Sequence, residues 1–170
     1  MRTGYKITDA EMLTYQSFQW TLNVWVESSG KGELCNDGWL HFYDDPILAV
    51  MVKPIHLGIP VNPRMFRCEC EGEFKEDSGL KFGCTRARLV EELLFPKVST
   101  TQRVAFATLV TKEVCQDKAW NKWADDWLSG KDRSAWAAAW AARAAARAAR
   151  ENTKPPDLIA LTHKAVGEYK

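Results

Sequence analysis

The side chains best suited to binding a ligand stand in one segment, residues 134–151. Large residues recur there at spacings of 4, 3, 4 and 3, which place them on one face of an α-helix. We name this face the Trp/Arg stripe, and it consists of Trp136, Trp140, Arg143, Arg147 and Arg150. Arg presents forked donors to phosphate or carboxylate, and Trp offers a flat ring for stacking. The spacing therefore predicts a surface for an anionic ligand.

A structural interpretation of the same helix stays open. The other residues from 136 to 150 are all alanine, so neighbouring helices could approach closely while the Trp/Arg stripe fills a groove. Arg also suits the C-terminal end of a helix, where it complements the dipole. Two observations favour a ligand: the basic residues there are all Arg, and residues 98–170 carry a net charge of +4 against −3 for residues 1–97.

Cysteine and histidine are the next candidates for chemistry. Five residues could converge across strands as metal ligands: Cys35, His41, Cys68, Cys70 and Cys84. Structural zinc sites usually combine two CxxC-like knuckles, whereas this chain has one Cys-x-Cys inside a strand pattern, where small buried cysteines are common. We therefore predict no metal and no cofactor.

Motifs of catalysis are missing from the sequence. It contains no phosphate-binding glycine loop, no HExxH pair, no EF-hand loop and no GxSxG elbow. Three His and five Cys make chance pairings of a nucleophile with a base easy. The overall net charge of +1 favours no class of partner. These observations lead us towards a protein that is not an enzyme.

The first half of the chain has the patterns of strands and turns. Alternation predicts a half-buried strand or bent hairpin over residues 15–26 and a strand over 65–74. Helical signals predict a short helix over 47–53, capped by Asp45 and ending before Pro54. Further expected elements are short strands over 39–43 and 81–84 and a helix over 86–95 capped by Thr85.

The second half has helical patterns. A helix opens at Ser99 with Val104, Ala107, Val110 and Val114 on one face, and an apolar face runs from Trp120 to Leu128, which we expect to dock onto the sheet. Another helix begins at Ser134, and Asp157 caps the last one, over 158–169. The expected fold is α+β: a mixed β-sheet with short helices over 1–97 and a helical region over 98–170, packed on it as one structural unit.

Location follows from what the sequence lacks. Its first ten residues are polar, and no apolar run is long enough to span a bilayer. An odd number of cysteines without an export signal favours reduced thiols. We expect a cytoplasmic protein without a membrane partner.

The stretch Cys35-Asn-Asp-Gly-Trp-Leu-His-Phe-Tyr-Asp-Asp-Pro46 resembles a family of uncharacterised small phage and prophage proteins. Members of that family carry a Cys and then a Gly, followed by a His that comes after an aromatic residue or Leu. An Asn-Pro or Asp-Pro pair and a helix come next. The strands expected over 67–72 and 81–84 and the Ala/Trp/Arg helix are also similar, so the resemblance covers roughly residues 13–150. It implies a phage origin, and in that case the cytoplasm is that of the host cell. By association, it also implies a protein that blocks or sequesters a host defence component.

A fainter likeness concerns an enzyme. ADP-ribosyltransferase-like folds place a strand and a helix, similar to those expected after Leu40, beside their nicotinamide pocket. That likeness would recruit Tyr15, Tyr43, and Glu91 or Glu92. Our main hypothesis is a non-enzymatic, phage-encoded binding protein whose Trp/Arg stripe meets a nucleotide, a nucleic acid or an acidic host protein. The alternatives are a nucleotide-acting enzyme and a homo-oligomer built on the Ala-rich helix.

Overall fold

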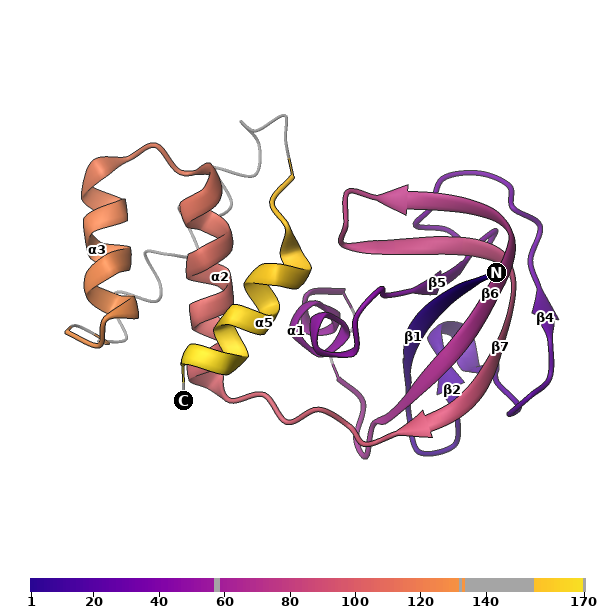
Figure 1. Ribbon diagram of the computed structural model, residues 1–170. Helices are drawn as coiled ribbons and strands as arrows, with labels where there is room; N and C mark the ends of the chain where they lie inside the picture. Colours follow the sequence, from indigo (N-terminus) through magenta and orange to yellow (C-terminus); the bar gives the residue numbers. More distant parts are fainter. Residues whose placement is uncertain (57–58, 132, 134–154, 170) are drawn as a thin grey trace. The chain divides into compact units, whose positions relative to one another are not determined.

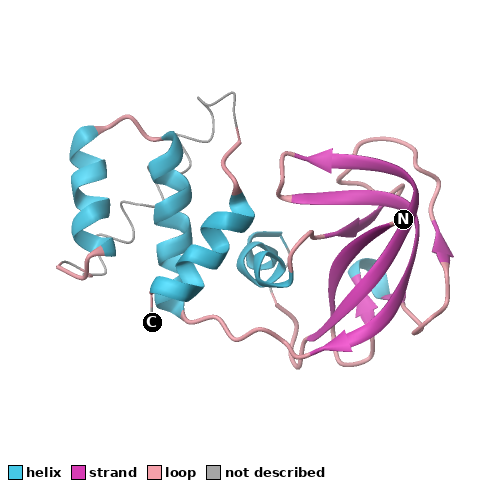
Figure 2. Ribbon diagram, viewed as in Figure 1, coloured by secondary structure: helices cyan, strands magenta, loops and turns pink. Residues whose placement is uncertain are grey.

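A computed structural model describes residues 1–56, 59–131, 133 and 155–169 of the chain. The chain divides into two compact units, Met1–Lys97 and Val98–Lys170, and each is described by itself (Figure 1). The described part of unit 1 holds strands and one α-helix, and that of unit 2 holds helices (Figure 2). The predicted α+β class is confirmed. Within these ranges, no helix is long and apolar enough to cross a membrane.

Two long strands form the centre of unit 1. They are β6 (Arg64–Asp77) and β7 (Lys81–Leu93), which pair as an antiparallel hairpin. The strand β1 (Arg2–Thr8) pairs with the other edge of β6, while β4 (Val26–Glu27) and β5 (Leu40–Phe42) share the other edge of β7. A second, minimal sheet pairs β2 (Leu13–Thr14) with β3 (Phe18–Gln19).

The expectation of a mixed sheet is wrong for the described strands. All their ladders are antiparallel, and the one parallel pairing among them is an isolated bridge between Leu22 and Leu89. The reason lies in the connections: β6 and β7 are joined by a tight turn, and parallel neighbours would need a crossover of a dozen or more residues.

The main sheet curls until it meets itself. Tyr5 of β1 and Tyr43, just after β5, exchange two backbone hydrogen bonds of 2.8 and 3.1 Å. Because β5 already pairs with β7, this exchange closes a ring of β1, β6, β7 and β5. Register shifts between Arg67 and Cys68 and between Glu71 and Phe74 mark bulges, and bulges bend strands. The curvature of β6 and β7 is visible in Figure 1.

The inside of the ring is the core of unit 1. Its alternating strand positions confirm the strand predicted over 65–74, since Phe66, Cys68 and Cys70 are buried. Trp20 and several residues of β5 and β7 complete the cluster: Leu40, Phe42, Phe82, Cys84, Ala87 and Leu89. The core is crowded enough that β1 needs a glycine, because a Cβ at Gly4 would lie 2.9 Å from both Phe42 Cβ and Phe82 Cζ.

The helix predicted over 86–95 is wrong, because these residues continue β7. Ala87 and Leu89 are buried in the core, whereas Arg86 and Arg88 face outward and bind Glu71 and Glu69 of β6. Cross-strand pairs of this kind stabilise a sheet and override a weak helical pattern.

The long strand predicted over 15–26 is also wrong. The segment begins with a single 3-10 turn, η1 (Tyr15–Ser17), and then holds only the short strands β3 and β4. Gln16 and Ser17 have left-handed φ values of 58° and 57°, which end any extended run. Trp20 is buried, but its expected partners in alternation, Leu22 and Val24, are exposed.

The helix α1 (Pro46–His56) starts as predicted. Asp45 Oδ1 accepts hydrogen bonds from the backbone N–H groups of Ile47 and Leu48, at 2.8 and 2.9 Å. Its expected end before Pro54 is wrong, since the helix continues to His56. A proline removes one helical hydrogen bond, and here it does so close to the C-terminal end, where α1 already packs on β1.

Unit 2 contains α2 (Thr100–Val114), α3 (Lys118–Leu128) and α5 (Leu158–Glu168). The predicted starts at Ser99 and Asp157 are confirmed, because Ser99 forms a capping box with Gln102 and Asp157 caps α5. Asp117, which was not predicted as a cap, caps α3. The helix predicted from Ser134 lies outside the described residues. Within the unit, α2 contacts both α3 and α5.

The apolar face of α3 is confirmed, because Trp120, Ala124 and Trp127 are buried. Trp120 packs with Cys115 and Trp123 of the same unit, and its docking onto the sheet stays a prediction. The face expected for α2 is wrong: Ala107 is exposed, and the buried residues are Ala105, Phe106, Thr108, Leu109 and Thr111. The two threonines can be buried because their hydroxyls donate to the carbonyls of the preceding turn.

A methyl group added at Gly4 tests the crowded ring. We expect Gly4→Ala to lower the free energy of unfolding by about 1–3 kcal/mol, because the new Cβ overpacks a rigid core. Chemical unfolding followed by circular dichroism measures the loss. The matched control is Gly167→Ala in α5, where nothing lies within 4 Å and stability should rise slightly. Equal stabilities of Gly4→Ala and the wild type would contradict the tight closure.

Candidate functional site

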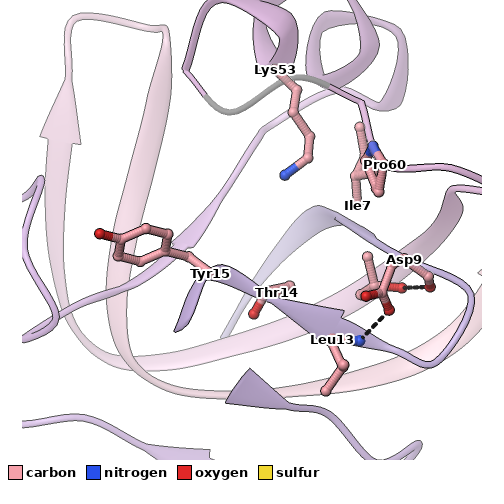
Figure 3. A pocket seen from close by; sticks show the side chains of 8 residues that line it. Ile7, Asp9, Leu13, Thr14, Tyr15, Lys53 and Pro60 are labelled. Carbon is pink, nitrogen blue, oxygen red and sulfur yellow. Dashed lines mark hydrogen bonds between the residues drawn. The ribbon is translucent and has the colours of Figure 1, made fainter. Parts of the chain in front are cut away.

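A cavity of about 240 Å³ opens in unit 1 between β1, the β2–η1 segment and the end of α1 (Figure 3). Most protein pockets for drug-sized ligands are somewhat larger, roughly 300–1,000 Å³, so this one suits a smaller molecule. We name it the Lys53 pocket; its lining residues are Ile7, Thr8, Asp9, Leu13, Thr14, Tyr15, Lys53 and Pro60.

Three elements position these side chains. Alternation along β1 turns Lys6 towards the core aromatics and Ile7 towards the pocket. Asp9 Oδ1 accepts from the backbone N–H groups of Glu11 and Leu13, at 3.1 and 2.7 Å, and so fixes the turn that carries the β2 residues. The helix α1 supplies Lys53 from the opposite side (Figure 3).

Lys53 is the unusual residue of the pocket. Its side chain points into the cavity (Figure 3), and its ammonium forms no hydrogen bond or ion pair with any residue that the structure describes. Burial lowers the pKa of Lys53, because the charged form loses solvation. A partly buried cation without a partner is costly, so the site favours an incoming anion or the neutral amine.

Of the two hydroxyl groups at the pocket, only that of Thr14 can assist Lys53, because the Tyr15 phenol points away from Lys53 (Figure 3). Thr14 Oγ1 accepts a hydrogen bond from Trp20 Nε1 at 3.0 Å, which leaves the hydroxyl proton of Thr14 available to a ligand. Tyr15 lies on the rim and is 67% exposed. Both belong to a strained segment, because Met12, Gln16 and Ser17 all have left-handed φ values. Strain of this kind concentrates at ligand sites.

A second lysine lies near the first, on the core side of β1. Lys6 Nζ donates to the carbonyl of His41 at 2.8 Å and lies over the rings of Trp20 and Phe42, at 5.0 and 4.8 Å from their centroids. The pKa of Lys6 is lowered to about 8, chiefly by burial and in smaller part by the charge of Lys53. Unlike Lys53, Lys6 therefore has protein partners for its charge.

The residues of the phage-like motif have structural roles. His41 Nε2 donates to the carbonyl of Leu34, which ties down the loop before β5, and burial lowers the pKa of His41. Gly38 allows this loop to pack, since a Cβ there would lie 2.0 Å from the Lys31 carbonyl oxygen. Asp45 caps α1. The motif thus describes a clamped loop and a helix start.

The candidate metal ligands converge only in part. Cys68, Cys70 and Cys84 share the core, and burial raises the pKa of Cys68 to about 12. Cys35 is exposed instead, and its Sγ accepts from Lys81 Nζ at 3.3 Å. In the described ranges, no three or more His, Cys, Asp or Glu side chains are grouped to hold a metal ion.

The residues of the enzyme alternative do not share the Lys53 pocket. Of them, only Tyr15 lines it. Tyr43 closes the ring through its backbone, and burial raises the pKa of its phenol to about 12. Glu91 and Glu92 on β7 form ion pairs with Arg67 and Arg64.

The Trp/Arg stripe, Trp136, Trp140, Arg143, Arg147 and Arg150, lies outside the described residues. Lys53, in contrast, was not among the residues predicted to bind. Its one signal in the sequence is a lysine that ends an apolar helical run, Ile47 to Val52, where burial of the amine is forced.

Comparison with known proteins gives one match. The sequence pattern of a family described as Domain of unknown function (DUF7666) matches residues 2–101, more than half of the 170 residues. No curated protein and no solved structure matches the chain.

The lowered pKa of Lys6 predicts a pH-dependent stability. Between its folded pKa of about 8 and its ordinary value of 10.5, the unfolded state binds a proton that the folded state lacks. The free energy of unfolding should therefore rise, by up to about 1 kcal/mol from about pH 7.5 to 9. Above pH 9, buried thiols such as Cys68, whose pKa is raised from 9.0, oppose the rise.

Urea unfolding at both pH values measures this slope, and Lys6→Met is the matched variant. The variant should show a smaller rise whatever its absolute stability, and the part that remains comes from Lys53, whose pKa burial also lowers. The same rise in Lys6→Met as in the wild type would show that another group titrates.

Proposed function

We propose that this chain, which belongs to the DUF7666 family of domains of unknown function, is a non-enzymatic binding protein that holds a small anionic ligand in the Lys53 pocket. The observation that carries the proposal is the Lys53 ammonium, which points into the cavity without a partner in the described part of the chain. Burial removes part of the solvation energy of the ammonium, and the Coulomb attraction of an anion at short range would offset that loss.

The other lining groups define what the ligand looks like. Thr14 offers a hydroxyl proton to its oxygens, and Ile7, Leu13 and Pro60 offer apolar contact to its body. Asp9 also lines the pocket, and its carboxylate disfavours a second negative charge on the ligand. We therefore infer a small monoanion, such as a carboxylic acid with a short apolar part.

The wider role that we propose rests on the sequence. The resemblance of Cys35–Pro46 to small phage proteins supports a phage-encoded protein that sequesters a signal or a host defence component. The Trp/Arg stripe supports a second contact with an anionic partner, because three Arg side chains at the predicted helical spacing would repel one another unless an anion lies near.

A titration with sodium benzoate, followed by the amide resonances of Ile7, Leu13 and Thr14, tests the pocket. We expect Lys53→Met to weaken benzoate binding about tenfold or more, because a charge-assisted hydrogen bond contributes roughly 1.5–3 kcal/mol. The matched control is Lys31→Met, which removes an exposed lysine of the same unit and should bind as the wild type does. Equal affinities of Lys53→Met and the wild type would refute the anion site.

The Trp/Arg stripe has its own test. Changing Arg143, Arg147 and Arg150 together to Glu should abolish binding of ATP and of a single-stranded oligonucleotide, because the charge of the face is reversed. Fluorescence anisotropy measures the affinities, and circular dichroism verifies that the helix content is kept. Replacement of the same residues by Lys should retain part of the affinity. If the Glu variant binds as tightly as the wild type, the stripe is not the binding surface.

A further inference from the structure

We propose that Lys53 is also a reactive amine, which forms a reversible imine with small aldehydes and ketones that enter the Lys53 pocket. The inference rests on the pocket of the proposed function and adds covalent chemistry to it. The observation behind it is geometric: the amine points into a cavity with apolar walls, and no described residue binds its lone pair or its protons.

The surroundings of Lys53 favour the nucleophilic form. Desolvation lowers the pKa of this amine. Desolvation in an apolar pocket is one way in which proteins activate a lysine amine at neutral pH. Lys6 itself is not exposed to the pocket in the same way, because it lies under Trp20 and Phe42 and donates to His41.

The reaction balances without any co-reactant. The nitrogen lone pair of Lys53 attacks the carbonyl carbon, a C–N bond forms, and the carbonyl π electrons move to oxygen. A proton passes from nitrogen to that oxygen and gives a carbinolamine. The C–O bond then breaks and water leaves, with its second proton supplied by the hydroxyl of Thr14. The nitrogen lone pair forms the C=N bond, and its remaining proton returns to that hydroxyl.

The walls of the pocket select the class of carbonyl compound. Ile7, Leu13 and Pro60 fit a short aliphatic body, and a cavity of about 240 Å³ leaves no room for a large ring system. Small aliphatic aldehydes therefore suit the site better than bulky aromatic ones.

Reductive trapping tests the proposal. The full-length protein is incubated at neutral pH with limiting butyraldehyde and sodium cyanoborohydride, which adds hydride to the imine carbon and leaves a stable secondary amine. Peptide mass spectrometry then compares Lys53 with the exposed lysines Lys31, Lys97 and Lys118. We expect several-fold more label on Lys53, because each unit of pKa depression raises the neutral fraction about tenfold. The α-amino group of Met1 is left out, since its ordinary pKa is already near 8.

Three comparisons make the result decisive. Lys53→Arg should lose the label while the exposed lysines keep theirs, and Thr14→Val should slow the labelling of Lys53. A bulky naphthaldehyde should label the exposed lysines but not Lys53. Label on Lys53 no higher than on Lys31, or equal label on Lys6 and Lys53, would overturn the proposal. Butyraldehyde carries no charge, so its failure to react would overturn the imine proposal only. The anion site is tested separately by the benzoate titration.

Discussion

The exchange of two backbone hydrogen bonds between Tyr5 and Tyr43 is the constraint on which unit 1 depends. Without it, β5 would end on β7 and the sheet would stay open, with one face of Phe42 and Phe82 uncovered. With it, a small sheet encloses its own core. The closure demands strong curvature, which the two bulges of the β6–β7 hairpin supply, and it demands a close approach of strands, which explains why position 4 is a glycine.

The same closure builds the Lys53 pocket. It leaves β1 with two different sides, one towards the core with Lys6 and the other towards α1 with Ile7. It also fixes Tyr43, and Asp45 starts α1 two residues later, so the direction of the helix follows from the closure. The end of α1 then brings Lys53 over β1, next to the strained turn that carries Tyr15. The pocket is thus a consequence of sheet curvature and of one helix cap.

Local signals in the sequence predicted the elements that depend on local physics. Asp45 and Ser99 cap helices because their oxygens meet nearby N–H groups, and the alternation over 65–74 reports one buried face. The predictions that failed concern residues whose structure depends on contacts with residues far away in the sequence. Arg86 and Arg88 bind Glu71 and Glu69 only after the chain has turned back, so a weak helical spacing was misleading. Lys53 escaped prediction for the same reason, since its neighbours Ile7 and Thr14 are far away in the sequence.

The two neighbouring lysines show why Lys53 stands out on energetic grounds. Both lose solvation, and the charge of Lys53 disfavours that of Lys6. The protein compensates Lys6 with a carbonyl and two aromatic faces, which are contacts that a stable fold can provide by itself. For Lys53 the described chain provides only the cavity. A charge that burial destabilises and that the described fold leaves without a partner lowers stability, and sequences keep such residues chiefly where a ligand or a reaction uses them.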